Sequence, residues 1–94
     1  MRYSREHSRA ARELALIAAR RLSLLALTTS PEDFEALCPG EMENFENERE
    51  RAADDMRLGH GKLRSLFEEE ALDAFEAETN RIRVSMIFPT CAAQ

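Results

Sequence analysis

The stretch "SPED", residues 30–33, constrains the fold of this chain more than any other feature of its sequence. Ser30 is a preferred N-cap, Pro31 suits the first helical position, and Asp33 stands where a capping-box acid reaches back. A helix therefore begins at Ser30, directly after an apolar segment that ends at residues 28–29. Helices joined by so short a connection are normally antiparallel neighbours. The sequence therefore predicts a helical hairpin at this point.

A first helix is predicted from about residue 4 to residue 28, with Ser4 as its cap. Its apolar residues recur at spacings of three and four and cover more than half of its girth. They are Leu14, Leu16, Ile17, Ala18, Leu22, Leu24, Leu25 and Leu27. A helix that is apolar on so many sides usually contacts neighbours on two of them. We therefore expect it to lie centrally in a bundle or to take part in an oligomer.

The Pro-Gly pair at residues 39–40 predicts a break in the second helical region, because proline has no amide hydrogen to continue the ladder. We expect a short helix over residues 31–38, with Phe34 and Leu37 facing the first helix. A separate helix is predicted over residues 41–58. Its apolar residues keep roughly the heptad spacing that is typical of a coiled coil.

The sequence Gly-His-Gly at residues 59–61 decides the architecture. A turn there predicts a compact antiparallel bundle of about three helices, whose third helix covers residues 62–87 and precedes a frayed tail at 89–94. A continuous helix instead predicts a rod over residues 41–87, about 70 Å long, that is covered only by dimerisation. Two glycines favour the turn. We therefore expect one all-α domain over residues 1–94 that self-associates.

Charge is distributed unevenly along the chain. Residues 1–21 carry six arginines and two glutamates, a balance of +4, whereas residues 31–80 carry 16 acids and five bases, a balance of −11. This asymmetry favours pairing of the first helix with the acidic remainder, within the chain or between chains. An acidic chain repels nucleic acid over most of its surface, so we expect no nucleic-acid partner. The whole chain has a net charge of −5.

No stretch approaches the roughly 20 apolar residues that a membrane span requires, and we expect none. The two cysteines, Cys38 and Cys91, form no Cys-x-x-Cys motif. This usage predicts reduced thiols and a cytoplasmic protein, although a single bridge between the two is the alternative.

The pattern of chemically reactive residues predicts no enzyme, no metal site and no cofactor. His7 and His60 lack the Glu-x-x-His or His-Glu-x-x-His spacing of helical metal sites. Most of the carboxylates lie on the polar side of the helical pattern, among them Glu43, Glu46, Glu50, Glu68, Glu69 and Glu70. We interpret them as a solvated acidic surface.

The remaining candidate function is protein binding. The apolar positions exceed what a core of 94 residues covers, and methionine with phenylalanine is an adaptable lining for helix-binding surfaces. We expect the partner to be an amphipathic helix of another protein or a second copy of the chain. The candidate binding residues are Leu22, Leu25, Phe34, Leu37, Met42, Phe45, Met56, Phe75, Ile82 and Met86.

Residues 22–58 resemble small flagellar secretion chaperones of the FliT type. An apolar helix ends near a threonine, an acid-rich helix start with an aromatic residue and a leucine follows, and a long charged helix comes next. Phe34, Leu37, Glu41 and Met42 stand in comparable places. The family's second region is one continuous helix, whereas the Pro-Gly pair predicts a break here.

This resemblance implies a cytoplasmic, non-enzymatic helical bundle of the flagellar type III secretion system. Such a protein shields an amphipathic C-terminal helix of an export substrate and presents it to the export machinery. The resemblance also implies that the segment after Gly61 covers the binding groove until a substrate displaces it. The alternative from the apolar pattern alone is a structural or regulatory homodimer with no separate ligand.

Overall fold

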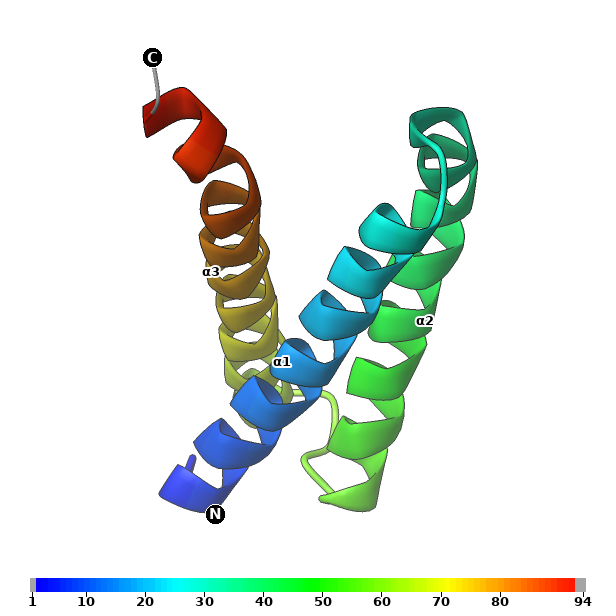
Figure 1. The fold of residues 1–94 in the computed structure, drawn as a ribbon. Helices are drawn as coiled ribbons and strands as arrows, with labels where there is room; N and C mark the ends of the chain where they lie inside the picture. Colours follow the sequence, from blue (N-terminus) through cyan, green and yellow to red (C-terminus); the bar gives the residue numbers. More distant parts are fainter. Residues whose placement is uncertain (1, 93–94) are drawn as a thin grey trace.

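The computed structural model describes residues 2–92 and the side chains of residues 2–82. Its three helices are α1 (Arg5–Thr28), α2 (Pro31–Asp55) and α3 (Lys62–Ala92). Figure 1 shows α1 and α3 running in one direction and α2 in the other. The predicted all-α bundle of three helices is therefore confirmed.

The first helix lies between the other two, as its broad apolar surface predicted. α1 packs most extensively against α3 and less against α2, whereas α2 and α3 share the fewest contacts. The C-terminal part of α3 and the connection between α1 and α2 diverge in Figure 1. The centre of the bundle is therefore α1, and α2 and α3 are held together largely through it.

The core combines small side chains on α1 with large ones on its neighbours. The buried residues of α1 are Ala11, Ala15, Ala18 and Ala19. Phe45 of α2 and Phe75 of α3 stack with their ring centroids 4.5 Å apart, and Phe67 is fully buried beside them in the same core. Alanine allows neighbouring helices to approach α1 closely, so the phenylalanine rings supply most of the volume in the core.

Both predicted helix starts are confirmed. The Ser4 hydroxyl accepts a hydrogen bond from the His7 amide at 3.3 Å, and the Ser4 amide donates to His7 Nδ1 at 3.0 Å. The Ser30 hydroxyl accepts from the Asp33 amide at 3.2 Å, but the predicted reciprocal bond from the Ser30 amide to the Asp33 carboxylate is not formed. These bonds satisfy amides that have no partner in the first helical turn. The antiparallel hairpin of α1 and α2 follows from the extended backbone at Ser30 and at Thr29, which ends α1.

The predicted break at residues 39–40 is wrong, because α2 continues through Pro39 and Gly40. A short helix over 31–38 and a separate helix from residue 41 do not form. Pro39 and Gly40 are exposed, whereas Phe45, further along the same helix, is 1% exposed. Burial of such a ring stabilises a helix by about 1.5–3 kcal/mol, which is comparable with the cost of about 3 kcal/mol for an interior proline. Packing of the part of α2 that follows the proline therefore helps to maintain the helix.

The turn favoured at residues 59–61 is confirmed, and α2 ends slightly before it, at Asp55 rather than at residue 58. The Arg57 amide donates to the Asp54 carbonyl at 3.0 Å, and the Leu58 amide donates to the Ala53 carbonyl at 3.1 Å. These two bonds form a Schellman motif, with Arg57 in the left-handed conformation at φ 57°. Leu58 is 5% exposed and belongs to the core, so the motif ends the helix and anchors the turn.

Arg64 of α3 holds the same turn from the other side. It is 8% exposed, and its Nη1 donates to Asp54 Oδ1 at 2.7 Å and to the Gly59 carbonyl at 3.3 Å. The hydrogen bond from Arg64 lowers the pKa of the Asp54 carboxyl below its ordinary value. One buried guanidinium therefore connects the end of α2, the turn and the start of α3.

The last helix extends further than predicted. It begins at Lys62, as expected, but continues to Ala92 instead of ending at residue 87, so residues 89–92 are helical. A proline removes one hydrogen bond from a helix without necessarily ending it, and the helical backbone passes through Pro89. Residues 93–94 lie outside the described residues.

Candidate protein-binding surface

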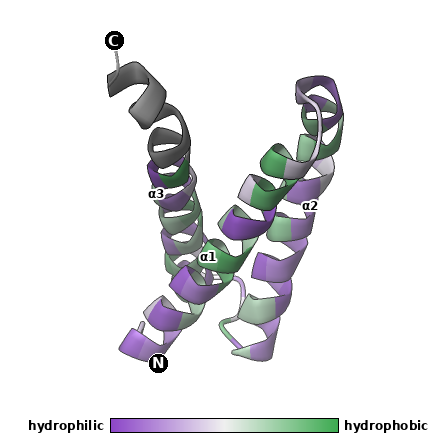
Figure 2. Ribbon diagram, in the orientation of Figure 1, coloured by the Kyte–Doolittle hydropathy of each residue, from purple (hydrophilic) through white to green (hydrophobic). Residues whose placement is uncertain are grey.

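Three large apolar side chains project into solvent from the side of α1 that faces away from the core. Ile17, Leu24 and Leu27 are 56%, 62% and 67% exposed. They follow one another at seven and three residues, so they lie along one side of the helix. Figure 2 shows hydrophobic colour on α1 toward its C-terminal end. We call these three residues the outer ridge.

The outer ridge is exposed because the opposite side of α1 already forms the core. Ala15 and Ala19 are fully buried there, between α2 and α3. A helix that is apolar on most of its girth has more apolar surface than two neighbours cover. The leucines and isoleucine of the ridge therefore remain outside the bundle, and such an exposed patch marks interaction sites.

An ion pair between α1 and α2 borders the outer ridge. Arg21 donates from Nη1 and Nη2 to the two carboxylate oxygens of Glu48 at 2.7 and 2.6 Å, and its Nε lies 3.8 Å from Glu41 Oε2. The hydrogen bonds from Arg21 lower the pKa of the Glu48 carboxyl. Leu37, which is 48% exposed, lies one helical turn before Glu41 on the same side of α2. The exposed Leu37 therefore lies on the side of α2 that carries Glu41, the residue near Arg21 of α1.

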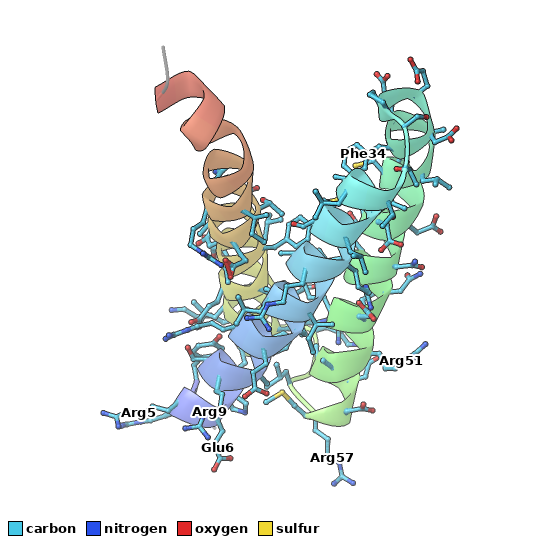
Figure 3. All side chains as sticks on the ribbon, viewed as in Figure 1. Arg5, Glu6, Arg9, Phe34, Arg51 and Arg57 are labelled. Atoms are coloured by element: carbon cyan, nitrogen blue, oxygen red, sulfur yellow. The ribbon has the colours of Figure 1, made fainter. Side chains whose placement is uncertain are left out.

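The N-terminal half of α1 carries a basic hollow rather than apolar surface. The hollow has a volume of about 330 Å³ and is lined by Arg5, Ser8, Arg9, Arg12, Glu13 and Leu16. Figure 3 shows Arg5 and Arg9 projecting from the N-terminal end of α1, away from the bundle. The outer side of α1 thus changes from basic to apolar along its length.

A partly buried carboxylate joins the start of α1 to α3. Glu70 accepts hydrogen bonds from the hydroxyls of Tyr3, at 2.5 Å, and Ser8, and from Arg12 Nε at 3.1 Å. These donors, Ser8 first, lower the pKa of the Glu70 carboxyl, whereas burial and the bond to Glu70 raise that of the Tyr3 hydroxyl. Glu70 was predicted to belong to a solvated acidic surface, and that prediction is wrong because these hydroxyls reach it across the helix interface.

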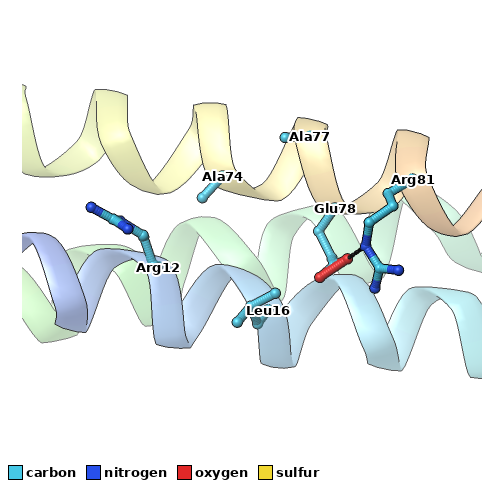
Figure 4. A pocket seen from close by; sticks show the side chains of 6 residues that line it. All are labelled: Arg12, Leu16, Ala74, Ala77, Glu78 and Arg81. Carbon is cyan, nitrogen blue, oxygen red and sulfur yellow. Dashed lines mark hydrogen bonds and ion pairs between the residues drawn. The ribbon is translucent and has the colours of Figure 1, made fainter.

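A shallow groove of about 290 Å³ lies between α1 and α3. Figure 4 shows its lining, which consists of Arg12, Leu16, Ala74, Ala77, Glu78 and Arg81. Glu78 is 8% exposed and accepts a hydrogen bond from Arg81 Nε, one turn along α3. Because its charged groups are already paired with one another or with Glu70, the groove offers little for a polar ligand to bind.

The structure distributes the ten predicted binding residues over several environments. Phe45 and Phe75 are 1% and 5% exposed and form the core, so neither is on the surface. Three others are partly buried and pack against that core: Leu22, Met42 and Met56. The half-buried residues Leu25, Phe34 and Ile82 complete the set of covered positions. They are not gathered on one exposed surface.

Of the same ten residues, Leu37 is the one with a strongly exposed side chain among those described. It was predicted to face α1 together with Phe34; its 48% exposure shows that α1 does not cover it. Figure 3 shows Phe34 beside the upper end of α1. Met86 lies outside the residues whose side chains are described.

The outer ridge was missed as a binding surface. In the sequence its residues belong to a general apolar stripe, and the methionines and phenylalanines are the stronger candidates for a binding surface. The available signal was that Leu16 and Leu27 extend the apolar pattern of α1 beyond one face. Two neighbours cannot cover so wide a pattern when alanines allow them to pack closely on one side.

Within residues 2–82, no group of three or more histidine, cysteine, aspartate or glutamate side chains is placed to hold a metal ion. Cys38 is a half-buried free thiol in α2. None of the helices, over the part of the chain that is described, is both long and apolar enough to cross a membrane. Comparisons with protein-family models, with curated proteins and with solved structures find no match for this chain.

Proposed function

We propose that this protein is a non-enzymatic helical module that binds an amphipathic helix of another protein along the outer side of α1. The observation that carries the proposal is the outer ridge, where Ile17, Leu24 and Leu27 each expose more than half of their surface. An amphipathic helix binds such a surface through apolar side chains at spacings of three, four and seven residues. The spacing within the ridge is of this kind.

A finer form of the proposal is that the protein is a cytoplasmic export chaperone and that the bound helix belongs to a flagellar or secretion substrate. The resemblance of residues 22–58 to flagellar chaperones supports this form. The continuity of α2 through residues 39–40 removes a difference between this chain and the family's pattern. In this role the ridge shelters apolar side chains of the substrate until export.

The experiment mixes the protein with amphipathic helices from the C-termini of candidate export substrates and measures complexes by size exclusion with light scattering. The variant Leu24→Glu/Leu27→Glu places two charges on the ridge and should weaken binding at least about tenfold, because charges are depleted at interface cores. The control is Leu72→Glu, whose leucine is 36% exposed on α3. The free energy of unfolding of both variants should lie within about 0.5–1 kcal/mol of that of the parent protein, because the substituted side chains are exposed.

A stoichiometric complex that is lost in the ridge variant and kept in the Leu72 variant supports the proposal. Failure of every helix to bind contradicts it, as does a complex that is insensitive to the ridge variant. The same light-scattering measurement on the protein alone tests the homodimer alternative. A dimer that becomes a monomer when Leu24 and Leu27 are replaced would place a second copy on the ridge instead of a partner.

A further inference from the structure

The basic hollow and the outer ridge form one continuous track along α1. Arg9, Glu13, Leu16, Arg20, Leu24 and Leu27 follow one another at spacings of three or four residues. Such spacing places successive side chains one above the other on a single face of a helix. From Arg9 to Leu27 the track is about 27 Å long, at 1.5 Å per residue. A helix of about 18 residues would cover it.

The charges on this track are mainly positive, although the chain as a whole has a net charge of −5. Arg5, Arg9 and Arg20 are exposed, and none of them forms an ion pair with the described residues. Glu13 is the carboxylate within the hollow, and the exposed Glu6 lies beside Arg9 in Figure 3. Two further arginines of α1 are already paired within the bundle. Arg12, which lines the hollow, pairs with Glu70 of α3, and Arg21 pairs with Glu48 of α2. The unpaired arginines are therefore available to carboxylates of a partner.

A second copy of this chain fits the track less well than an acidic helix does. In an antiparallel pairing of two α1 helices about a two-fold axis, the register that sets Ile17 against Leu24 places the axis close to Arg20. The two Arg20 side chains then lie side by side, and like charges at an interface destabilise it. The net charge of −5 on each copy adds a further repulsion. An acidic helix from another protein brings no arginine opposite Arg20, and its carboxylates can pair with the exposed Arg5, Arg9 and Arg20.

We propose that the partner of this surface is an acidic amphipathic helix of another protein, with carboxylates over the Arg5–Arg9 end of the track and large apolar side chains over the outer ridge. This inference rests on the proposed function and names the chemistry of the bound helix. Opposite charges at the rim of an interface set the rate of association and the choice of partner. The apolar ridge supplies the buried contact area.

The test uses two designed peptides of about 20 residues with identical leucines at one end and either glutamates or lysines at the other. Binding is measured by fluorescence anisotropy on the full-length protein. The glutamate peptide should bind at least about tenfold more tightly at low salt, and the difference should shrink near 0.5 M NaCl because salt screens exposed charges. The variant Arg5→Glu/Arg9→Glu should reverse the preference.

The matched control is Arg51→Glu, which reverses an exposed arginine of α2 that points away from α1 in Figure 3. This variant should keep the preference for the glutamate peptide within about twofold, because Arg51 lies on α2 and does not contact a helix bound along the outer side of α1. Circular dichroism checks that all variants keep the parent's helical content.

Equal binding of the two peptides overturns this inference, and so does a preference that the Arg5→Glu/Arg9→Glu variant leaves unchanged. In either case the proposed function still stands if the Leu24→Glu/Leu27→Glu variant abolishes both complexes. Binding of neither peptide overturns this inference. If the natural helices tested above also fail to bind, the proposed function fails with it. A dimer of the protein alone that excludes the glutamate peptide also overturns the inference, because a second copy then occupies the track.

Discussion

Pro39-Gly40 lies in the middle of α2, which continues through it, whereas Gly59 and Gly61 lie in the turn between α2 and α3. Both stretches contain residues that disfavour helix, and each was predicted as a break or turn. The difference lies in what surrounds them. Beside Gly59, Leu58 is buried and Arg64 donates to the Gly59 carbonyl, whereas Pro39 and Gly40 are exposed. A helix ends where the turn itself makes stabilising contacts, and unfavourable residues alone do not end it.

The largest expected effect comes from removing the buried contact at the turn. Leu58→Ala should lower the free energy of unfolding by about 2–4 kcal/mol, because Leu58 is 5% exposed and its loss leaves a cavity. Leu37→Ala, beside Pro39, should lower it by less than about 1 kcal/mol, because Leu37 is 48% exposed. Urea unfolding followed by circular dichroism measures both. Equal losses in the two variants would contradict the comparison.

One substitution should have opposite signs at the two stretches. Gly40→Ala should raise the free energy of unfolding by about 0.5–1 kcal/mol, because Gly40 is in a helix interior and a Cβ there meets no atom within 4 Å. Gly59→Ala should lower it by about 1–2 kcal/mol, because Gly59 has φ 73°, a left-handed conformation that alanine rarely adopts. The same Cβ has open space at Gly59, so crowding cannot explain a loss.

The same unfolding measurement decides this second prediction. A gain at both positions would show that the backbone at Gly59 relaxes without cost, so that the turn does not depend on its left-handed residue. A loss at both would show that Gly40 needs the freedom of glycine beside Pro39. Either result would contradict the distinction between residues 39–40, where the helix continues, and residues 59–61, where the chain turns.

Local signals predicted the parts of the fold that local chemistry determines. The caps at Ser4 and Ser30 and the turn at residues 59–61 depend on neighbouring residues, so the sequence was sufficient. The continuity of α2 at Pro39 depends on burial of side chains such as Phe45 against other helices, which are distant in the sequence. Propensity describes the cost of the proline and contains no information about that compensating burial.

The candidate surface was harder to predict for a related reason. Sequence patterns rank large apolar residues as core, but α1 buries Ala15 and Ala19 and exposes Leu24 and Leu27. Both groups recur at helical spacing, so periodicity alone cannot distinguish the covered side from the open one. The decision depends on how closely α2 and α3 approach α1, which is a property of the packed bundle.

The smallest expected effect concerns acid. Asp54 accepts a hydrogen bond from Arg64 at the turn, and this bond lowers the pKa of its carboxyl below the ordinary value of 3.8. Such a group contributes stability that is fully present above its pKa in the unfolded chain and is lost as the pH falls through its lower pKa in the folded protein. Residues 36–40 carry no charged side chain, so the stretch around Pro39 has no equivalent.

Asp54→Asn should therefore reduce the loss of stability between pH 6 and pH 3, seen as a smaller fall in the urea midpoint than in the parent protein. The fall should not disappear, because hydrogen bonds from Arg21 and from Ser8 also lower the pKa values of Glu48 and Glu70. The control is Asp55→Asn, the adjacent carboxylate, for which the described residues show no ion pair. The effect is small because the Asp54 side chain is 64% exposed and solvent screens the pair. If Asp55→Asn reduced the loss of stability in acid as much as Asp54→Asn does, general charge repulsion and not the bond to Arg64 would cause that loss. The turn would then differ from the stretch around Pro39 in packing alone.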